Sequence, residues 1–395
     1  AVALAVLVRR QRAAVMMPPP PTMRAVVARD GRLVVQHEWP TPVAAEGEVR
    51  SLLLPALALP VYAAHARYRA LCLMLVVPLC LPRHLSQVLI RVMATGINRL
   101  DTVQRKGLAK PPAGVTEVLG LECAGEVVVS RDSRFLLGDR VMALLPGGGY
   151  AEYVSVSAQT VLPMPSHMTW AEGASVAEAW LTAYQLVVLV AGVKRGEAVL
   201  IHAAASGVGL AAIQIVVALG AIPVVTVGSK DKLDVCVEYG AAGGAIRHDG
   251  DWITKVAALS PTKCFQVVLD PVAGAYAAQN LEALAVDGRW VLYSSLSGSA
   301  MGDELSKTFL KALMVKRISL LATTLRARPL EYKADLVRRF ARDVLPQLGR
   351  PNGMRLAIDW HIQGLERAQA AHDYMESNAN IGKIVLGVGA DGEDA

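Results

Sequence analysis

The stretch HAAASGVGLAAIQ at 202–214 decides the fold. It follows the apolar run AVLI (198–201) and opens an apolar segment of helical character that ends near Gly220. A strand that turns directly into a helix presents free backbone N–H groups at the helix N-terminus, where the helix dipole favours an anion. The sequence therefore predicts that a phosphate binds at this turn.

The side chains of the turn leave room for a phosphate against the backbone. The predicted contacts are Ser206, Gly207, Val208 and Gly209, with Val208 facing the sheet. The alternative is a tight turn whose small residues serve only helix-on-sheet packing, since a single glycine motif is weakly specific.

Strand-like and helical runs alternate around this turn. We expect a helix over 210–220 and strands over 197–202, 222–228, 265–270 and 289–295. This order predicts an α/β fold with a Rossmann doubly wound parallel-sheet domain. Such sheets bind ligands beyond the carboxyl ends of their strands, which makes Tyr293, Ser294 and Ser295 candidate cofactor-binding residues.

The end of the next strand selects the cofactor. Sites for NAD usually carry an acidic residue about 20 residues after the glycine turn, where it binds the ribose 2′-OH. Here the segment reads GSKDK at 228–232. The Ser229 hydroxyl and the Lys232 ammonium suit a 2′-phosphate and favour NADPH over NADH, provided that Asp231 points outward. A solvated helix lysine is the alternative interpretation of Lys232.

The composition indicates a globular protein with reduced cysteines. The 395 residues are 53% hydrophobic and 19% charged, with a net charge of +6. Arginines in two acid-free segments, 1–22 and 50–88, account for the positive excess, so no nucleic-acid partner is expected. The five cysteines form no C-x-x-C pair, which argues against a structural zinc lobe or disulfide framework and favours a cytoplasmic location.

The same two segments interrupt a regular pattern. Residues 1–22 are interpreted as a disordered extension before Met23, where a strand–turn–strand pattern begins; a mitochondrial presequence is the alternative. Residues 50–88 are interpreted as an atypical insert, because their deletion joins EGEV to LIRV as one alternating strand. Prolines break their apolar runs below the roughly 18 residues of a membrane helix, so no membrane partner is expected.

Outside these segments, the chain resembles the medium-chain dehydrogenase/reductase superfamily in its zinc-free quinone oxidoreductase branch. The motifs that join 202–214 are ATGINRLDTVQRKG (94–107), VLGLECAGEV (118–127), GDRVMALLPGGGYAEYV (138–154), AEAWLTAYQL (177–186), GRWVLYSS (288–295) and NIGKIVL (380–386). The combination of LLPGGG, EAWLTA and HAxxSGVG looks most like the tumour-suppressor-inducible NADPH quinone reductase subgroup.

The resemblance implies two domains. A GroES-like catalytic domain would comprise 23–175 and 325–395, and a Rossmann NADPH-binding domain would comprise 176–324, with the substrate in the cleft between them. The resemblance also implies a homodimer joined through the Rossmann domains.

The resemblance further implies that no metal is bound. Zinc-dependent relatives have a Cys where this chain has Asn98 and a His where it has Leu121, and zinc needs thiolate, imidazole or carboxylate donors. Without the Lewis acidity of zinc, the expected reaction is hydride delivery to an acceptor that is already electrophilic, a quinone or an activated alkene. No catalytic acid or base is assigned.

Site residues also follow from the resemblance. The 206–209 turn would hold the pyrophosphate, and the remaining residues would be Asn98 and Thr182 at the nicotinamide and substrate, Ser229, Lys232 and Arg247 at the 2′-phosphate, and Asn380 and Lys383 closing over the cofactor. Each has a structural alternative: a turn residue for Asn98, helix packing for Thr182, and an ordinary strand start for 380–386. Relatives commonly have Tyr in place of Arg247.

The predicted function is therefore NADPH-dependent, zinc-independent hydride transfer to a quinone. The alternative is an alkenal or enone reductase, which would transfer the same hydride and differ only in the shape of its acceptor-binding site. The subgroup carries a tyrosine where this chain has Ala109, which removes an aromatic wall and a hydroxyl from the acceptor site. That departure and the insert favour a third alternative, a non-catalytic NADPH-binding protein with a crystallin-like or sensor role.

Overall fold

The computed structural model describes residues 19–42 and 86–388, and every structural statement below concerns these residues. Most of the predicted extension and insert lies outside them. Thr22, however, already begins strand β1 (Thr22–Arg29), and Gln87 begins strand β3 (Gln87–Ile97). Gln87 and Val88, predicted as the last residues of the insert, instead belong to this strand, where Val88 is fully buried and pairs with strands on both sides.

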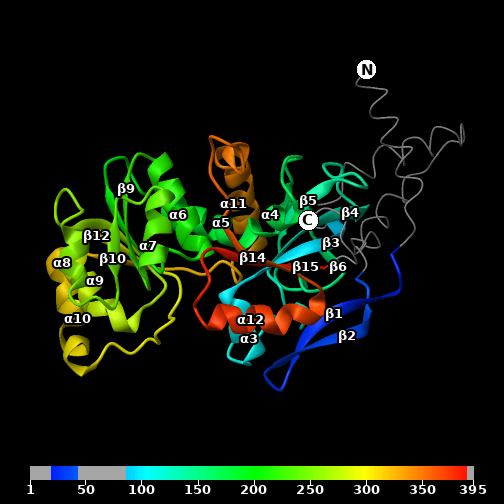
Figure 1. The fold of residues 1–395 in the computed structure, drawn as a ribbon, viewed down its shortest axis with the longest axis horizontal. Coiled ribbons are helices and arrows are strands. Elements are labelled where there is room, and N and C mark those ends of the chain that lie inside the picture. The colour runs from blue at the N-terminus through cyan, green and yellow to red at the C-terminus, as the bar shows by residue number, and fades with distance from the viewer. Residues whose placement is uncertain (1–18, 43–85, 389–395) are drawn as a thin grey trace, which may run out of the picture.

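One lobe contains a parallel sheet flanked by helices (Figure 1). Its strands lie in the order β10-β9-β8-β11-β12-β13, and each neighbouring pair is parallel. The order reverses between β8 and β11, which is the crevice where sheets of this kind bind ligands. The predicted doubly wound α/β fold is confirmed. The strands are β8 (Ala198–His202), β9 (Ile222–Val227), β10 (Gly244–Ile246), β11 (Phe265–Asp270), β12 (Leu284–Leu292) and β13 (Ser319–Ala322).

Helices cover both faces of this sheet. Val199 and Ile201 of β8 pack into the same hydrophobic layer as α6 and α7, whereas Ala198 and Leu200 pack into the layer of α8, α9 and α10. Because both faces are buried, β8 is apolar at every position except its last, His202, rather than alternating. The helices are α6 (Gly207–Ala218), α7 (Lys230–Glu238), α8 (Trp252–Ala257), α9 (Ala277–Ala283) and α10 (Asp303–Lys316), with the 3₁₀ turn η7 (Gly274–Tyr276).

The other lobe is a largely antiparallel sheet in the order β14-β15-β3-β4-β5-β7, with β6 paired to β3. The strands β1 and β2 form the predicted hairpin beside it, turned by Asp30 and Gly31, whose φ angles of +49° and +75° are left-handed. The remaining strands are β2 (Arg32–Pro40), β4 (Glu122–Ser130), β5 (Arg140–Leu144), β6 (Tyr153–Ser157), β7 (Val161–Pro163), β14 (Ile358–Gln363) and β15 (Lys383–Gly387). Its short helices are α3 (Arg99–Arg105), α4 (Trp170–Ala174), α12 (Ala368–Glu376), η5 (Ala158–Thr160) and η9 (Leu365–Arg367).

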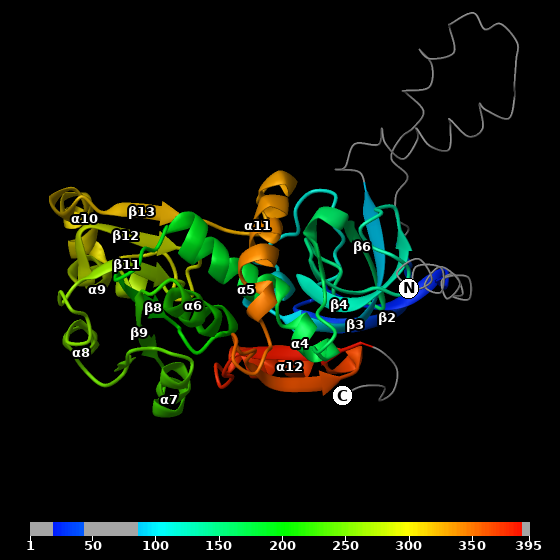
Figure 2. The same cartoon turned by 90° about the horizontal axis from the view of Figure 1, so that it is seen from above.

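Two helical segments lie between the lobes, α5 with the turn that follows it and α11 with the turn that follows it, as Figure 2 shows for α5 and α11. A single hydrophobic core runs through them, from Met142 of β5 through Leu181 and Phe340 to Leu210 of α6. The two lobes therefore share one hydrophobic core. The segments are α5 (Ala177–Tyr184), the π-helical turn η6 (Gln185–Val190), α11 (Leu330–Asp343) and η8 (Leu345–Gln347). Within 19–42 and 86–388, no helix combines the length and apolarity that a membrane span requires.

Candidate functional site

The turn between β8 and α6 has the compact geometry that its sequence predicted. Ser206 caps α6, and its Oγ accepts the N–H of Gly209 at 3.1 Å. A Cβ at Gly209 would lie 2.3 Å from the carbonyl oxygen of Ala204, so only glycine fits there. Ala203 adopts a left-handed φ of +50°, which an alanine accepts only at a cost. Val208 packs against the hydrophobic core, as predicted.

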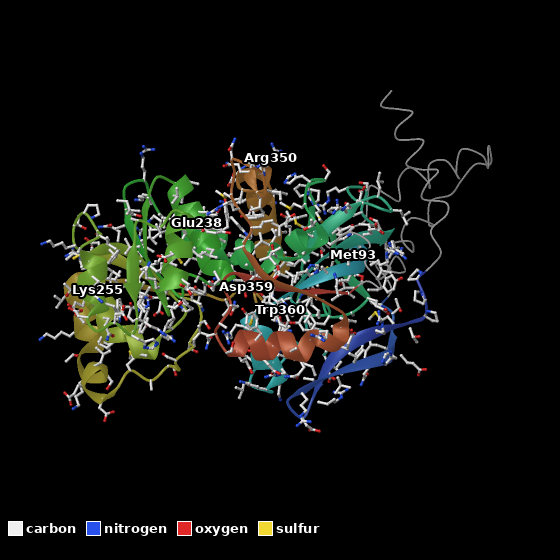
Figure 3. The ribbon with its side chains drawn as sticks, viewed as in Figure 1. Met93, Glu238, Lys255, Arg350, Asp359 and Trp360 are labelled. Atoms are coloured by element: carbon white, nitrogen blue, oxygen red, sulfur yellow. The ribbon has the colours of Figure 1, made fainter. Side chains whose placement is uncertain are left out.

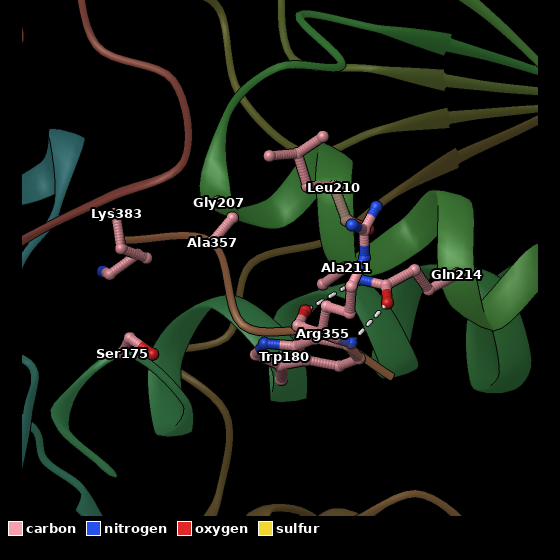
Figure 4. A pocket seen from close by; sticks show the side chains of 9 residues that line it. All are labelled: Ser175, Trp180, Gly207, Leu210, Ala211, Gln214, Arg355, Ala357 and Lys383. Carbon is pink, nitrogen blue, oxygen red and sulfur yellow. Dashed lines mark hydrogen bonds between the residues drawn. The ribbon is translucent and has the colours of Figure 1, made fainter. Parts of the chain in front are cut away.

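The C-terminal segment meets this turn from the other lobe. The N–H of Gly382 donates to the carbonyl of Ala205 at 2.8 Å, and Asn380 holds the segment by donating from Nδ2 to the Gly382 carbonyl at 3.0 Å. The side chain of Lys383 then passes over Gly207, where an added Cβ would lie 2.7 Å from Lys383 Cδ. Lys383 and Gly207 also border a small hollow beside α6 (Figure 4).

Lys383 ends in a buried polar cluster with Asn98 and Glu122. Its Nζ donates to Glu122 Oε1 at 2.5 Å, to Asn98 Oδ1 at 2.8 Å and to the Ile97 carbonyl at 3.0 Å. Asn98 Nδ2 donates to the same Glu122 oxygen at 3.0 Å. Gly96 gives this carboxylate room, because a Cβ there would lie 2.3 Å from Glu122 Oε1. The structure thus joins two predicted site residues, Asn98 and Lys383, through a third that was not predicted.

Glu122 also holds the start of α5. Its Oε2 accepts the backbone N–H of Glu178 at 2.8 Å. Thr182, predicted at the nicotinamide, lies one helical turn after Glu178 and is also half-buried. Burial, reinforced by the charge of Glu122, raises the pKa of Glu178 to about 8, against the opposing effect of Lys383.

A second buried network supports Asn98 from behind. Asp101 accepts the backbone N–H of Asn98 at 2.8 Å and the Tyr150 hydroxyl at 3.1 Å, and that hydroxyl lies 3.0 Å from His372 Nε2. Burial raises the pKa of Asp101 to about 6, although the hydrogen bonds from Asn98 and Tyr150 oppose this. Burial lowers the pKa of His372 to about 3, so its ring is neutral. The network fixes the position of Asn98.

The predicted 2′-phosphate residues gather beyond the end of β9. Ser229 caps α7, and Arg247 is the nearest neighbour of Gly228, with its Nε 3.9 Å from a Cβ built there. Lys232 donates from Nζ to the Asn378 carbonyl at 2.6 Å. Burial lowers the pKa of Lys232, Asp359 raises it, and the charges of Arg247 and Arg99 lower it further.

These cations form a positively charged cluster at the interface of the lobes. Arg99 joins it from α3 by donating from Nη2 to the Asn378 side-chain oxygen at 2.7 Å. Figure 3 labels Asp359, the acidic neighbour of the cluster, near the middle of the molecule. The excess of positive over negative groups suits a phosphate.

The three candidate cofactor-binding residues after β12 make fewer contacts with the rest of the candidate site. The strand ends at Leu292, so Tyr293, Ser294 and Ser295 follow it, at the carboxyl edge of the sheet. Tyr293 is half-buried, and burial and then Asp270 raise its pKa. Within the described residues, no hydrogen bond joins these side chains to the turn at 206–209.

The sequence analysis missed Glu122, Glu178, Asp101, Tyr150 and Arg99 as site residues. A signal existed for Glu122, because an acidic residue within the apolar run VLGLECAGEV must be paired when it is buried. The partner itself could not be inferred, since Lys383 lies far along the chain and reaches β4 only through the pairing of β15 with β3.

The residues of the site fit a dinucleotide. The glycine turn with the capped N-terminus of α6 follows β8, and the cation cluster follows β9, so both lie at the carboxyl edge of the parallel sheet. Asn98, which stands where zinc-dependent relatives have a Cys, accepts a hydrogen bond from the ammonium of Lys383. Among the residues that the structure describes, no group of three or more His, Cys, Asp or Glu side chains is arranged to hold a metal ion.

Two family models match the chain. Residues 84–166 match the alcohol dehydrogenase GroES-like domain, and residues 207–342 match the zinc-binding dehydrogenase family. The synaptic vesicle membrane protein VAT-1 homolog of Rattus norvegicus is 31% identical over 323 residues, covering 78% of this chain and 78% of that protein. The quinone oxidoreductase of Lama guanicoe is 30% identical over 304 residues, covering 76% of this chain and 88% of that protein.

Solved structures show the same architecture. The Escherichia coli quinone oxidoreductase complexed with NADPH has a TM-score of 0.65 at 26% identity, covering 76% of this chain and 91% of that one. A quinone oxidoreductase of Pseudomonas syringae shares the fold, with a TM-score of 0.69 at 23% identity over 93% of this chain and all of that one. The chain therefore belongs to the medium-chain dehydrogenase/reductase superfamily, in its quinone oxidoreductase branch, and is an oxidoreductase that uses a nicotinamide cofactor.

Proposed function

We propose that the protein is an NADPH-dependent reductase of quinones that works without zinc. The observation that carries this proposal is the contact of the glycine turn at 206–209 with the buried polar cluster of Lys383, Glu122 and Asn98. The relatives named quinone oxidoreductase support the acceptor class.

The chain's own contribution is to bind and orient. The turn at Ser206–Gly209 would hold the pyrophosphate with backbone N–H groups, and Ser229, Lys232 and Arg247 would hold the 2′-phosphate. The reduced nicotinamide supplies a hydride when it is bound. Asn98 and Thr182 would border the reacting ring, and the buried network of Asp101 and Tyr150 keeps Asn98 fixed.

The cofactor choice is tested at Lys232. We expect Lys232→Ala to weaken NADPH binding at least tenfold while changing NADH binding little, because only NADPH carries the 2′-phosphate. Isothermal titration with both cofactors measures this. Lys230→Ala is the matched control, since Lys230 is exposed on the same helix and pairs with Asp234. Equal losses for both cofactors in Lys232→Ala would contradict the assignment.

The acceptor is tested with two substrate panels. A structure titled CurK enoyl reductase, with a TM-score of 0.64 at 25% identity, favours activated alkenes as a second candidate class. Ala109 is half-buried just after α3, where it offers a smaller wall than an aromatic residue would. We expect NADPH oxidation with quinones to exceed that with alkenals and enones. Tight NADPH binding without turnover of either panel would point to a non-catalytic binding protein.

We further propose a homodimer formed in the cytoplasm. The outer edge of β13 is unpaired within the described residues, because β13 pairs only with β12 there. Beside it, α10 exposes Leu310 and Met314 at 72% and 77%. A second copy of the chain could continue the sheet across this edge and cover those side chains. Cys123 and Cys236, both buried as free thiols, are consistent with a reducing compartment.

A further inference from the structure

Helix α5 presents a polar face of two residues, of which the proposed function uses Thr182 and leaves Glu178 without a role. Every residue of this helix is buried except Glu178 and Thr182, which are one turn apart and therefore share a face. These two side chains are therefore the partly accessible part of a helix that is otherwise buried.

The first turn of α5, which carries Glu178, is tied to the cluster that holds the predicted substrate residue Asn98. Its backbone N–H binds one oxygen of Glu122, whose other oxygen binds both Asn98 and Lys383. No residue in the described part of the chain forms a hydrogen bond with the Glu178 carboxyl oxygens, so they stay available to a bound molecule.

A neighbouring donor is also without a partner. Arg326 donates from Nε to the Pro146 carbonyl and from Nη1 to Gln104 Oε1, both at 2.8 Å. Its Nη2 is buried and has no hydrogen-bond partner in the described residues. The acidic groups that face this guanidinium are Asp101 and Glu178. An oxygen atom of a bound acceptor would satisfy the free N–H groups, since a buried donor without a partner is costly.

The charged groups around Glu178 come from both lobes. They are Glu122 on β4, Asp101 on α3, Lys383 on β15 and Lys333 on α11. Burial is the largest effect and the two acidic neighbours add to it, whereas the two lysines oppose it, and the resulting pKa is about 8. Glu178 therefore carries a proton at neutral pH and returns to that state after losing it.

We propose that Glu178 is the acid that protonates the acceptor oxygen during reduction. This rests on the proposed function and adds a residue to it. Hydride arrival forms a new bond to hydrogen on the acceptor and leaves the electron pair on its carbonyl oxygen, as a hydroquinone anion or an enolate. The O–H bond of Glu178 then breaks, its proton bonds to that oxygen, and the carboxylate regains a proton from water. The nicotinamide is oxidised and the acceptor is reduced by two electrons.

Glu178→Gln tests this step, because the amide keeps the size and hydrogen-bonding capacity of the neutral acid but transfers no proton. We expect the single-turnover rate of NADPH oxidation by the acceptor to fall about 100-fold or more, with unchanged NADPH affinity. In the wild-type protein the rate should fall as the pH rises through about 8, and this dependence should vanish in the variant. Glu178→Asp should retain the pH dependence at a reduced rate. Glu282→Gln, at an exposed position, is the matched control.

A measurement without cofactor reports the protonation state directly. A raised pKa means that the folded protein binds a proton that the unfolded chain has released, so wild-type stability declines from the ordinary pKa of 4.5 up to about 8. Urea unfolding should therefore show Glu178→Gln gaining stability relative to wild type as the pH rises through this window.

The outcomes separate the two proposals. If the wild-type protein reduces neither panel of acceptors, both the proposed function and the proposed role of Glu178 are wrong. If the wild-type protein is active and Glu178→Gln has the same rate and pH profile, only the proposed role of Glu178 is wrong. A stability difference that does not change with pH would show an ordinary, ionised glutamate and would also overturn it.

Discussion

Lys383 is the side chain on which the two halves of the site converge. Its aliphatic stem covers Gly207 of the phosphate turn, and its ammonium group pairs with Glu122 in the other lobe. The two side chains are 7% and 0% exposed, so their charges are almost entirely removed from water. A buried pair contributes little to net stability compared with an apolar pair, but the loss of one partner leaves an uncompensated charge.

This asymmetry gives a prediction for Lys383→Met. We expect the free energy of unfolding to fall by about 3 to 5 kcal/mol, because the Glu122 carboxylate would stay buried without its cation. Urea denaturation at neutral pH measures the change. The double variant Lys383→Met with Glu122→Gln should recover much of the loss, since it buries no charge. Equal stability of the single and double variants would show that the pair is not coupled.

The cofactor-binding roles predicted for single residues stay predictions, and the contacts among those residues depend on the fold. The resemblance placed Asn98 and Lys383 at the cofactor, and the structure joins them by a hydrogen bond of 2.8 Å. It did not identify Glu122 or Glu178, because their roles arise from the meeting of β4, β15 and α5. Arg247 lies beside Gly228 as expected, and its part in phosphate binding stays a prediction.

At the scale of elements, the junction of β8 and α6 is the most constrained backbone of the site. The sequence predicted the strand, the turn and the helix, although the helix begins at Gly207 rather than at 210 because Ser206 caps it. The left-handed Ala203 could not be predicted, since alanine has no preference for that conformation. The strand predicted for 289–295 similarly ends early, at Leu292.

Gly209→Ala tests the constraint on this turn. The Cβ of the new alanine would lie 2.3 Å from a backbone oxygen that cannot move freely. We therefore expect the free energy of unfolding to fall by about 1 to 3 kcal/mol and NADPH binding to weaken. Gly228→Ala is a steric control for stability, because its Cβ would have no neighbour closer than 3.9 Å. Thermal unfolding and cofactor titration provide the two readouts. A stable Gly209→Ala protein that binds NADPH normally would show that the turn adapts.

At the scale of the whole molecule, one hydrophobic core is shared by the two lobes. The alternation of strands and helices predicted the Rossmann lobe, and the family motifs predicted the second lobe and the return of the chain to it. Composition could not predict that α5 and α11 join the two lobes, because this depends on which elements their apolar side chains contact in the folded chain. The domain limits at 175 and 325 fall near these uniting helices.

The proposed dimer gives a prediction at the same scale. We expect Met314→Glu to yield monomers, because it places a charge in an apolar patch that a second copy would cover. Sedimentation velocity measures the change in mass. Leu108→Glu, at a leucine that is 77% exposed in the other lobe, should leave the assembly unchanged. A wild-type protein that sediments as a monomer at micromolar concentration would refute the proposed interface.

The late position of β15 in the chain sets the order in which the site is built. Residues 206–209 leave the ribosome long before Gly382 and Lys383, which tie that turn to the far lobe. A nascent chain can therefore fold its Rossmann strands while the nucleotide crevice still lacks one wall. The contact of Gly382 with Ala205 and that of Lys383 with Glu122 can therefore form only after residue 383 has been synthesised.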